Sequence, residues 1–98
     1  MPLHIVRNDI AKSIHRIGKM ELLFDLVTDK LHGRPDELQS PPVKEAVQML
    51  SAYYESGDWL HDYELDEQQF LPSNLKRGVL SQDALYDLLS EIKNLTVQ

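Results

Sequence analysis

The sequence contains no cysteine. A disulfide framework, a thiolate metal site and a cysteine nucleophile are therefore excluded. Because small secreted domains usually need disulfide staples, the absence favours a cytoplasmic protein. No apolar run approaches the roughly 20 residues that a transmembrane helix requires, and the N-terminus lacks the long apolar core of a signal peptide. We therefore expect a cytoplasmic location and no membrane partner.

Basic side chains are also scarce, because ten Lys and Arg residues stand against sixteen Asp and Glu, a formal net charge of −6. Nucleic acid is not an expected partner, since phosphate binding needs clustered Lys and Arg. The four glycines form no phosphate-binding loop, and the four histidines are scattered along the chain. The 98 residues have room for one domain, and a hydrophobic content of 42% excludes a disordered acidic tail.

The negative charge is concentrated in the segment from Glu55 to Glu67. These thirteen residues include six acids and no Lys or Arg, while the rest of the chain balances ten basic against ten acidic residues. The six acids are Glu55, Asp58, Asp62, Glu64, Asp66 and Glu67. Two interpretations of this acidic segment are open: it is a site, or it is a solvated surface.

Apolar residues recur at helical spacing in three long segments and one short segment. They predict a helix over about 9–31, a second between Ser40 and Gly57, a short one beginning at Asp58, and a last one beginning at Ser81. A β-branched run predicts a short strand over residues 3–10. The expected fold is all-α, a small bundle of three main helices and one short helix. Residues 11–98 form its single helical domain, and residues 1–10 form an N-terminal extension.

The acidic segment contains residue types that bind metals and transfer protons. Asp58 and Asp62, four residues apart, would share one face of a helix. The spacing matches neither an EF-hand loop nor a zinc-binding HExxH helix, so we predict no metal, no cofactor and no catalytic residue. An enzyme acting on a small ligand or using a metal is the alternative. Its candidate residues are Asp62, Glu64, Asp66 and Lys76.

Lys76 and Arg77 precede a glycine and the predicted start of the last helix. In one interpretation, the two cations and the helix N-terminus bind a small anion. In the other, they neutralise the acids of residues 58–67 as an intramolecular clamp, with Arg77 holding a carboxylate through two hydrogen bonds. We favour the clamp because six neighbouring acids need counter-charge.

The part of the chain from Tyr53 to Leu89 has a dense pattern of aromatic, acidic and basic residues. It comprises Tyr53, Tyr54, Trp59, Asp62, Tyr63, Glu64, Asp66, Glu67, Leu71, Pro72, Leu75, Lys76, Arg77, Gly78, Val79, Leu80, Ser81, Asp83, Leu85, Tyr86, Leu88 and Leu89. This pattern, over residues 53–89, resembles the bacterial domain of unknown function 4298, and residues 14–50 fit that family more loosely. The resemblance implies a small, mainly helical domain and brings no activity with it.

A second resemblance concerns residues 3–10, LHIVRNDI, which are similar to the opening strand of macro domains. Macro domains bind ADP-ribose, and the resemblance implies that Asp9 and Ile10 would approach the adenine. The Asn-rich and Gly-rich binding loops of that fold have no counterpart here, so ADP-ribose binding is not implied. The likeness motivates the hypothesis that this domain works beside ADP-ribose chemistry, which calorimetry with ADP-ribose tests.

These features together predict a non-enzymatic protein-interaction or regulatory module whose acidic segment turns its aromatic side inward and its acids outward. Aromatic residues and Arg are the side chains that most often anchor interfaces. The candidate binding or structural-clamp surface comprises Tyr54, Trp59, Asp62, Tyr63, Glu64, Asp66, Lys76 and Arg77. The expected partner is a protein, and no feature of the sequence identifies it. The first helix has more apolar surface than the others, which makes a C2 homodimer one expected state beside the monomer.

Overall fold

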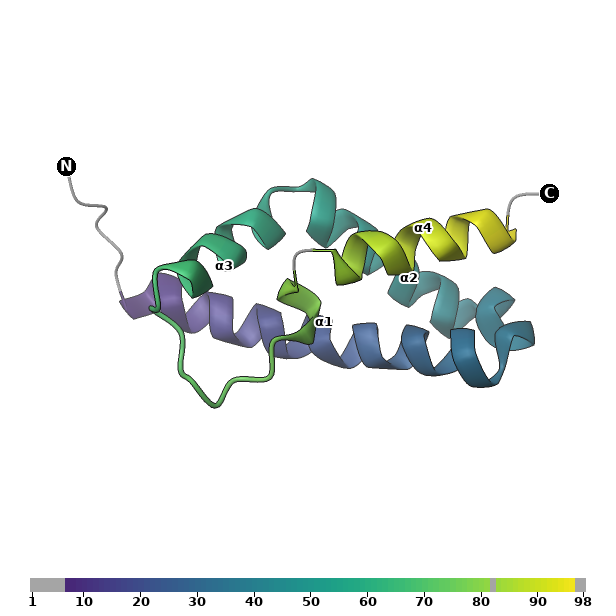
Figure 1. The fold of residues 1–98 in the computed structure, drawn as a ribbon, viewed down its shortest axis with the longest axis horizontal. Coiled ribbons are helices and arrows are strands. Elements are labelled where there is room, and N and C mark those ends of the chain that lie inside the picture. The colour runs from purple at the N-terminus through teal and green to yellow at the C-terminus, as the bar shows by residue number, and fades with distance from the viewer. Residues whose placement is uncertain (1–6, 82, 97–98) are drawn as a thin grey trace.

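The chain folds around one long helix, α1 (Arg7–Gly33), which contains 27 residues. A computed structural model describes residues 7–81 and 83–96 of the chain (Figure 1). Within those residues, three further helices and two short 3-10 helices follow α1. In chain order they are η1 (Pro35–Gln39), α2 (Pro41–Glu55), α3 (Asp58–Glu67), η2 (Gly78–Leu80) and α4 (Ala84–Thr96). All regular structure in the described residues is helical, which confirms the predicted all-α bundle of three main helices and one short helix.

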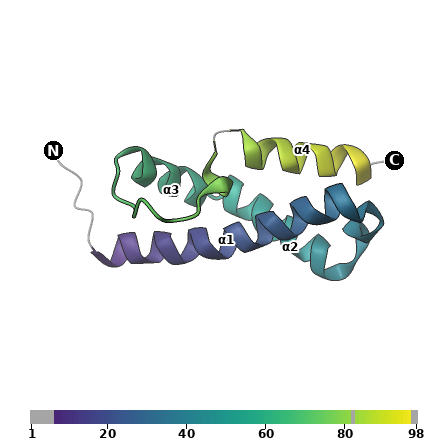
Figure 2. The ribbon, with the colours of Figure 1, turned by 60° about the horizontal axis from the view of Figure 1, so that its bottom comes forward.

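Helix α1 is the base on which the other elements pack, because it contacts each of them. With 27 residues it is about 40 Å long, at about 1.5 Å per residue. Helix α2 runs back beside α1 in the opposite direction, and α3 and α4 then follow one another along the length of α1 (Figures 1 and 2). Helix α3 therefore lies over the N-terminal half of α1, and α4 lies beside α2.

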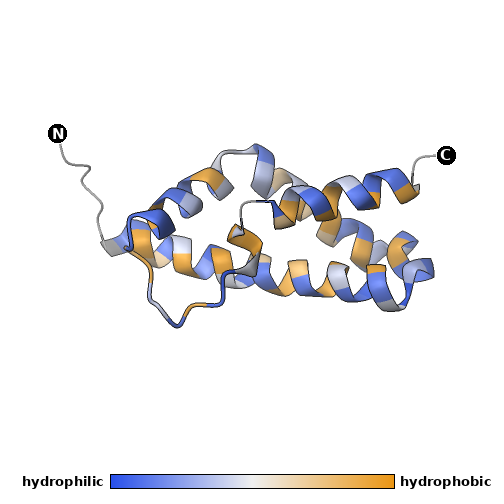
Figure 3. Cartoon of the chain, in the orientation of Figure 1, coloured by the Kyte–Doolittle hydropathy of each residue, from blue (hydrophilic) through white to orange (hydrophobic). Residues whose placement is uncertain are grey.

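The core is built from apolar side chains that recur at helical spacing. Four of them on α1 are Ile17, Met20, Val27 and Leu31, and burying each fully contributes about 1.5–3 kcal/mol. Figure 3 shows how hydrophobic and hydrophilic residues alternate along every helix, as the periodicity predicts. The other buried hydrophobic residues are Leu38, Val43, Ala46, Leu50, Tyr53, Trp59, Leu65, Leu71, Val79, Leu80, Leu85, Leu88 and Ile92.

The apolar stripe of α1 is covered by the chain itself. Its predicted members, all buried or packed against the core, are Ile10, Ile14, Ile17, Met20, Phe24, Val27 and Leu31. Leu22, which is 72% exposed, does not belong to this stripe. The surplus of apolar surface that favoured a homodimer is therefore used inside the molecule. The homodimer stays a prediction, and it needs another interface.

The N-terminal segment differs in part from its prediction. Residues 7–10 form the first turn of α1, so the strand predicted over residues 3–10 does not extend over them. Residues 3–6 of that prediction lie outside the described residues. Asp9 and Ile10 are therefore helical, unlike the strand residues that the resemblance to macro domains implies.

The junctions around α2 follow the expected turn chemistry only in part. Pro41 begins the helix, where its missing N–H costs nothing. The hydroxyl of Ser40 donates to the carbonyl of Glu37 at 2.7 Å, and so it closes η1 instead of capping α2. Gly57 separates α2 from α3 with a φ of 98°, a conformation that favours glycine. This sharp turn brings α3 back over α1.

Candidate functional site

Asp62 lies on the inner face of α3 and is completely buried. One of its oxygens accepts hydrogen bonds from Arg16 Nε at 2.9 Å and from the hydroxyl of Tyr53 at 2.7 Å. The other oxygen accepts from Arg16 Nη2 at 2.5 Å. The expectation that the acids all turn outward is therefore wrong for Asp62. It follows Trp59 by three residues, and this spacing places both side chains on the same, buried face of the helix.

Arg16 belongs to α1 and stands 46 positions before Asp62 in the sequence. The hydrogen bond to Asp62 raises the pKa of Arg16, so the guanidinium keeps its charge. Burial, followed by the hydrogen bond to Asp62, raises the pKa of Tyr53 well above its usual value of 10.0, so its hydroxyl stays a donor. The Asp62 carboxylate is thus occupied by protein donors on both oxygens. It joins three helices and faces no solvent.

Asp66, one turn further along α3, forms an ion pair with Nη1 of Arg77. Arg77 also donates from Nε to the carbonyl of Leu75 at 3.1 Å, and from Nη2 to the carbonyl of Pro72. Arg77 therefore contacts the acidic segment through a single carboxylate oxygen rather than through the two expected. Its remaining donors close the loop that connects α3 to η2.

Lys76 contacts a different helix from the one expected. Its Nζ lies 2.6 Å from Asp25 Oδ2 and 3.8 Å from Glu21 Oε2, and both acids belong to α1. The hydrogen bond to Asp25 raises the pKa of Lys76. The prediction that Lys76 neutralises the acids of residues 58–67 is therefore wrong. A cation on a surface loop reaches whichever acid the fold brings beside it, and here that acid is on α1.

Glu21 is a nearly buried acid that the sequence did not single out. Its Oε1 accepts a hydrogen bond from the backbone N–H of Val79 at 2.7 Å. A Cβ atom at Gly78 would lie 3.3 Å from Glu21 Oε2, so the missing side chain lets the backbone approach the carboxylate. From the other side, Trp59 Nε1 donates to the carbonyl of Val79 at 2.9 Å. Helix η2 is thus held between α1 and α3.

The consecutive residues Lys76, Arg77 and Gly78 therefore each meet a carboxylate: Asp25, Asp66 and Glu21, respectively. This arrangement attaches the loop to α1 and α3. The anion-binding interpretation has no support here, because both cations face carboxylates of the chain. The helix that begins at Gly78 is also only the three-residue η2.

Four aromatic rings form a continuous strip across three helices, which we call the aromatic strip. Tyr54 and Tyr86 have ring centroids 6.3 Å apart, Tyr54 and Trp59 5.3 Å, and Trp59 and Tyr63 stack at 5.1 Å. Tyr86 is 56% exposed, whereas Trp59 is only 9% exposed. Trp59, a predicted binding residue, is therefore mainly structural. Tyr86 was not among the predicted surface residues, although the family pattern of residues 53–89 includes it.

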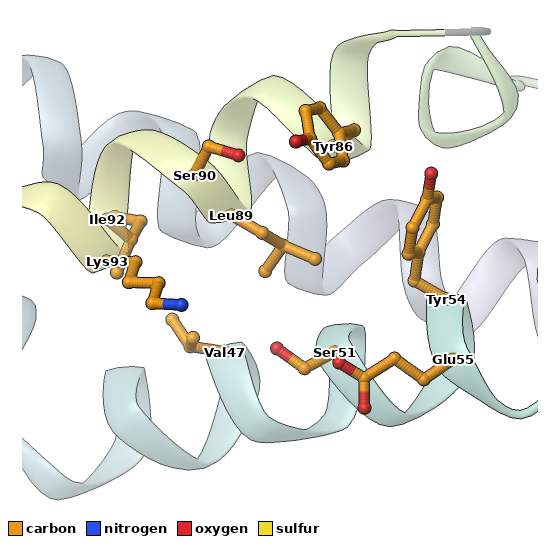
Figure 4. A pocket seen from close by; sticks show the side chains of 9 residues that line it. All are labelled: Val47, Ser51, Tyr54, Glu55, Tyr86, Leu89, Ser90, Ile92 and Lys93. Carbon is orange, nitrogen blue, oxygen red and sulfur yellow. The ribbon is translucent and has the colours of Figure 1, made fainter.

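One end of the aromatic strip lies in an open groove of about 460 Å³ between α2 and α4, the α2–α4 groove. Figure 4 shows side chains of the two helices pointing toward one another across it, with Tyr54 and Tyr86 at one end and Lys93 at the other. Its lining residues are Val47, Ser51, Tyr54, Glu55, Tyr86, Leu89, Ser90, Ile92 and Lys93. At the other end of the strip, Tyr63 lines a second pocket of about 390 Å³, beside Asp66, Glu67 and Arg77.

The six acids of the segment thus divide into two groups. Asp62 and Asp66 turn to arginines of the same chain. The other four are exposed and have no ion pair within the described part of the chain: Glu55, Asp58, Glu64 and Glu67. Among these, Asp58 lies near enough to Arg16 to help raise its pKa. Glu55 and Glu67 line the two pockets at the ends of the aromatic strip, and Glu64 is exposed on α3.

The residues of the enzyme alternative are not gathered into one site. Asp62 is enclosed, Glu64 is exposed, and Lys76 faces α1. Over residues 7–81 and 83–96, no three His, Asp or Glu side chains are grouped as metal ligands. No helix in this part of the chain has the length and apolar character needed to cross a membrane.

Comparison with known proteins finds one family model that matches most of the chain. The model is described as a domain of unknown function, DUF4298, and it matches residues 17–98. The matched residues include the whole of the 53–89 pattern, so the resemblance noted from the sequence is confirmed. No curated protein and no solved structure matches the chain.

Proposed function

This chain belongs to the DUF4298 family, and we propose that it is a non-enzymatic protein-interaction or regulatory module of the cytoplasm. The observation that carries the proposal is the aromatic strip, which reaches the surface at Tyr86 and ends in two open pockets. Large, rigid aromatic side chains bury much area at low entropic cost, and they are enriched among the residues that dominate binding energy.

Most charged residues of the candidate surface contact other residues of the same chain, which leaves the aromatic rings as the main groups for a partner. Asp62, Asp66, Lys76 and Arg77 make their closest polar contacts within the chain and hold the loop and α3 in place. Asp62 and Asp66 in this way hold α3, the helix that carries Trp59 and Tyr63. Of the predicted surface, a partner can reach Tyr54, Tyr63, the exposed Glu64 and Lys76, whose side chain is 71% exposed. Tyr86, which is 56% exposed, adds to this set.

The experiment that tests this proposal is affinity capture from the native host with three baits. Tyr86→Ala removes the most exposed ring of the strip, and Leu22→Ala removes an exposed apolar side chain of α1 that is not in the groove. We expect a partner to be retained by the wild-type chain and by Leu22→Ala, and lost by Tyr86→Ala. Circular dichroism of the three baits shows whether each is folded.

The proposal fails if the three folded baits retain the same proteins, or if none of them retains any. Substitutions of Trp59 and Arg77 are unsuited to this experiment. Both side chains bind backbone carbonyls inside the fold, so their loss would change the structure and the binding together.

A further inference from the structure

The α2–α4 groove has the dimensions and the lining of a helix-binding site. From Val47 to Tyr54 its α2 wall covers eight residues, which are seven steps of about 1.5 Å and so about 10 Å. A docked helix would present anchors at positions i, i+3 or i+4, and i+7 over the same distance. Val47, Leu89 and Ile92 supply apolar surface for such anchors, and the hydroxyls of Ser51 and Ser90 supply polar surface beside them.

The groove is charged differently at its two ends. Glu55 lies at the end where α2 meets α3. At the opposite end lie Lys93 and Lys44, the latter in a small adjoining pocket of about 170 Å³ that shares Val47 with the groove. Glu55 therefore favours a partner that places its positive charges at the end of the groove toward α3.

The aromatic rings reinforce the preference for a cation at the α3 end. Tyr54 and Tyr86 stand 6.3 Å apart in the same part of the groove as Glu55. A Lys or Arg side chain placed there can contact a carboxylate and the face of a tyrosine ring together. The same combination recurs at the far end of the aromatic strip, where Tyr63 and Glu67 line one pocket.

A second copy of the chain fits this groove poorly. Two copies paired groove to groove would bring two concave surfaces together and leave both volumes of about 460 Å³ unfilled. Each copy also has a net charge of −6, which opposes their approach. The groove needs a convex occupant that carries positive charge.

We propose that the α2–α4 groove binds an amphipathic helix of a protein partner, with the Lys or Arg residues of that helix at the end that faces α3. This inference deepens the proposed function and rests on it. The partner's apolar anchors fill the space between Val47 and Leu89, and its cations lie against Glu55, Tyr54 and Tyr86.

The test is an NMR titration of the complete chain with two synthetic helical peptides. Both peptides carry leucines along one face, and one has lysines at one end where the other has glutamates. We expect the lysine peptide to shift the amide resonances of Tyr54, Tyr86 and Leu89, with an affinity that falls as salt is added. We expect the glutamate peptide to bind about tenfold more weakly or not at all. Its negative charge has the same sign as the chain's net charge of −6, and if it turns end for end toward Lys93 it loses the two tyrosine rings.

A matched pair of variants shows whether the preference for the lysine peptide depends on the charge of Glu55. Glu55→Lys is expected to weaken the lysine peptide about tenfold. Glu45→Lys, the same change at an exposed position of α2 outside the groove, is expected to leave its affinity unchanged. Spectra of both variants without peptide show whether the fold is preserved.

Several outcomes would overturn the inference: equal binding of the two peptides, shifts that map outside the groove, or no binding of the lysine peptide at millimolar concentration. Concentration-dependent shifts of groove residues without peptide would identify a second copy as the occupant, and would also overturn it. If capture by the wild-type chain still depends on Tyr86 after such a result, the proposed function stands and only the helix partner is wrong.

Discussion

The contact between Arg16 and Asp62 offers a sharp test of the energetics of the acidic segment. Replacing Arg16 by Met keeps an unbranched side chain that can pack against α3, but it removes the guanidinium. The buried carboxylate of Asp62 then keeps one of its three hydrogen bonds, the one from the hydroxyl of Tyr53. An acid without its counter-charge is left inside the protein.

The expected magnitude follows from burial. Removing one partner of a buried ion pair typically costs about 3–5 kcal/mol. The side chain of Arg16 is 25% exposed, so water reaches the vacated position and lowers the cost. We therefore expect a loss of about 2–4 kcal/mol from a total stability of about 5–15 kcal/mol. The corresponding fall in the melting temperature is about 10–25 °C.

Urea unfolding followed by far-UV circular dichroism and by the fluorescence of Trp59, the one tryptophan of the chain, measures this loss. Arg34→Met is a matched control, because Arg34 also pairs with an acid, Glu37, but is 67% exposed. That control should cost less than about 1 kcal/mol. If the two Met variants lose the same free energy, the claim that Asp62 depends on Arg16 is refuted.

Three further predictions concern other parts of the molecule. Gly57→Ala should lower the free energy of unfolding by about 1–2 kcal/mol, because Gly57 has a φ of 98°; an unchanged melting temperature would contradict this. The hydrogen bond from Lys30 lowers the pKa of Glu37 below 4.5, so this contribution to stability is present above that pH and is lost as the pH falls through the lowered pKa. The melting temperatures of wild type and Glu37→Gln should therefore differ at pH 7 and converge at pH 3, and a constant difference would count against the contact. Light scattering over a concentration series tests the predicted homodimer, which would have to pair through a face other than the buried stripe of α1; a monomer at every concentration would contradict it.

The sequence predicted the helices well, because their signals are local. Apolar residues at steps of three and four define α1, α2 and α4, and Pro41 and Gly57 mark the limits of α2. The short helices η1 and η2 have too few residues for such a period to show. The chain topology places η2 against α1, and no local pattern in the sequence predicts that contact.

The contacts of the candidate site were harder to predict because their partners are distant in the sequence. Asp62 pairs with a residue 46 positions away, and Lys76 with one 51 positions away. The sequence alone does not distinguish a buried acid from an exposed one, because burial depends on which helix packs against it. The family pattern joined the acids to Arg77 correctly, because Asp66 pairs with it. The carboxylates that contact Lys76 and the backbone N–H of Val79 belong instead to α1.

The central claim is that the acidic segment is divided between acids that hold the fold and acids that face solvent. The most direct test compares the free energies of unfolding of two double variants on the same helix, Asp62→Asn with Asp66→Asn, and Glu64→Gln with Glu67→Gln. Each pair removes two negative charges. We predict that the first pair loses about 2–5 kcal/mol, because both acids have arginine partners, and that the second changes by less than about 1 kcal/mol. Equal losses from the two pairs, or a larger loss from the second, would contradict the division.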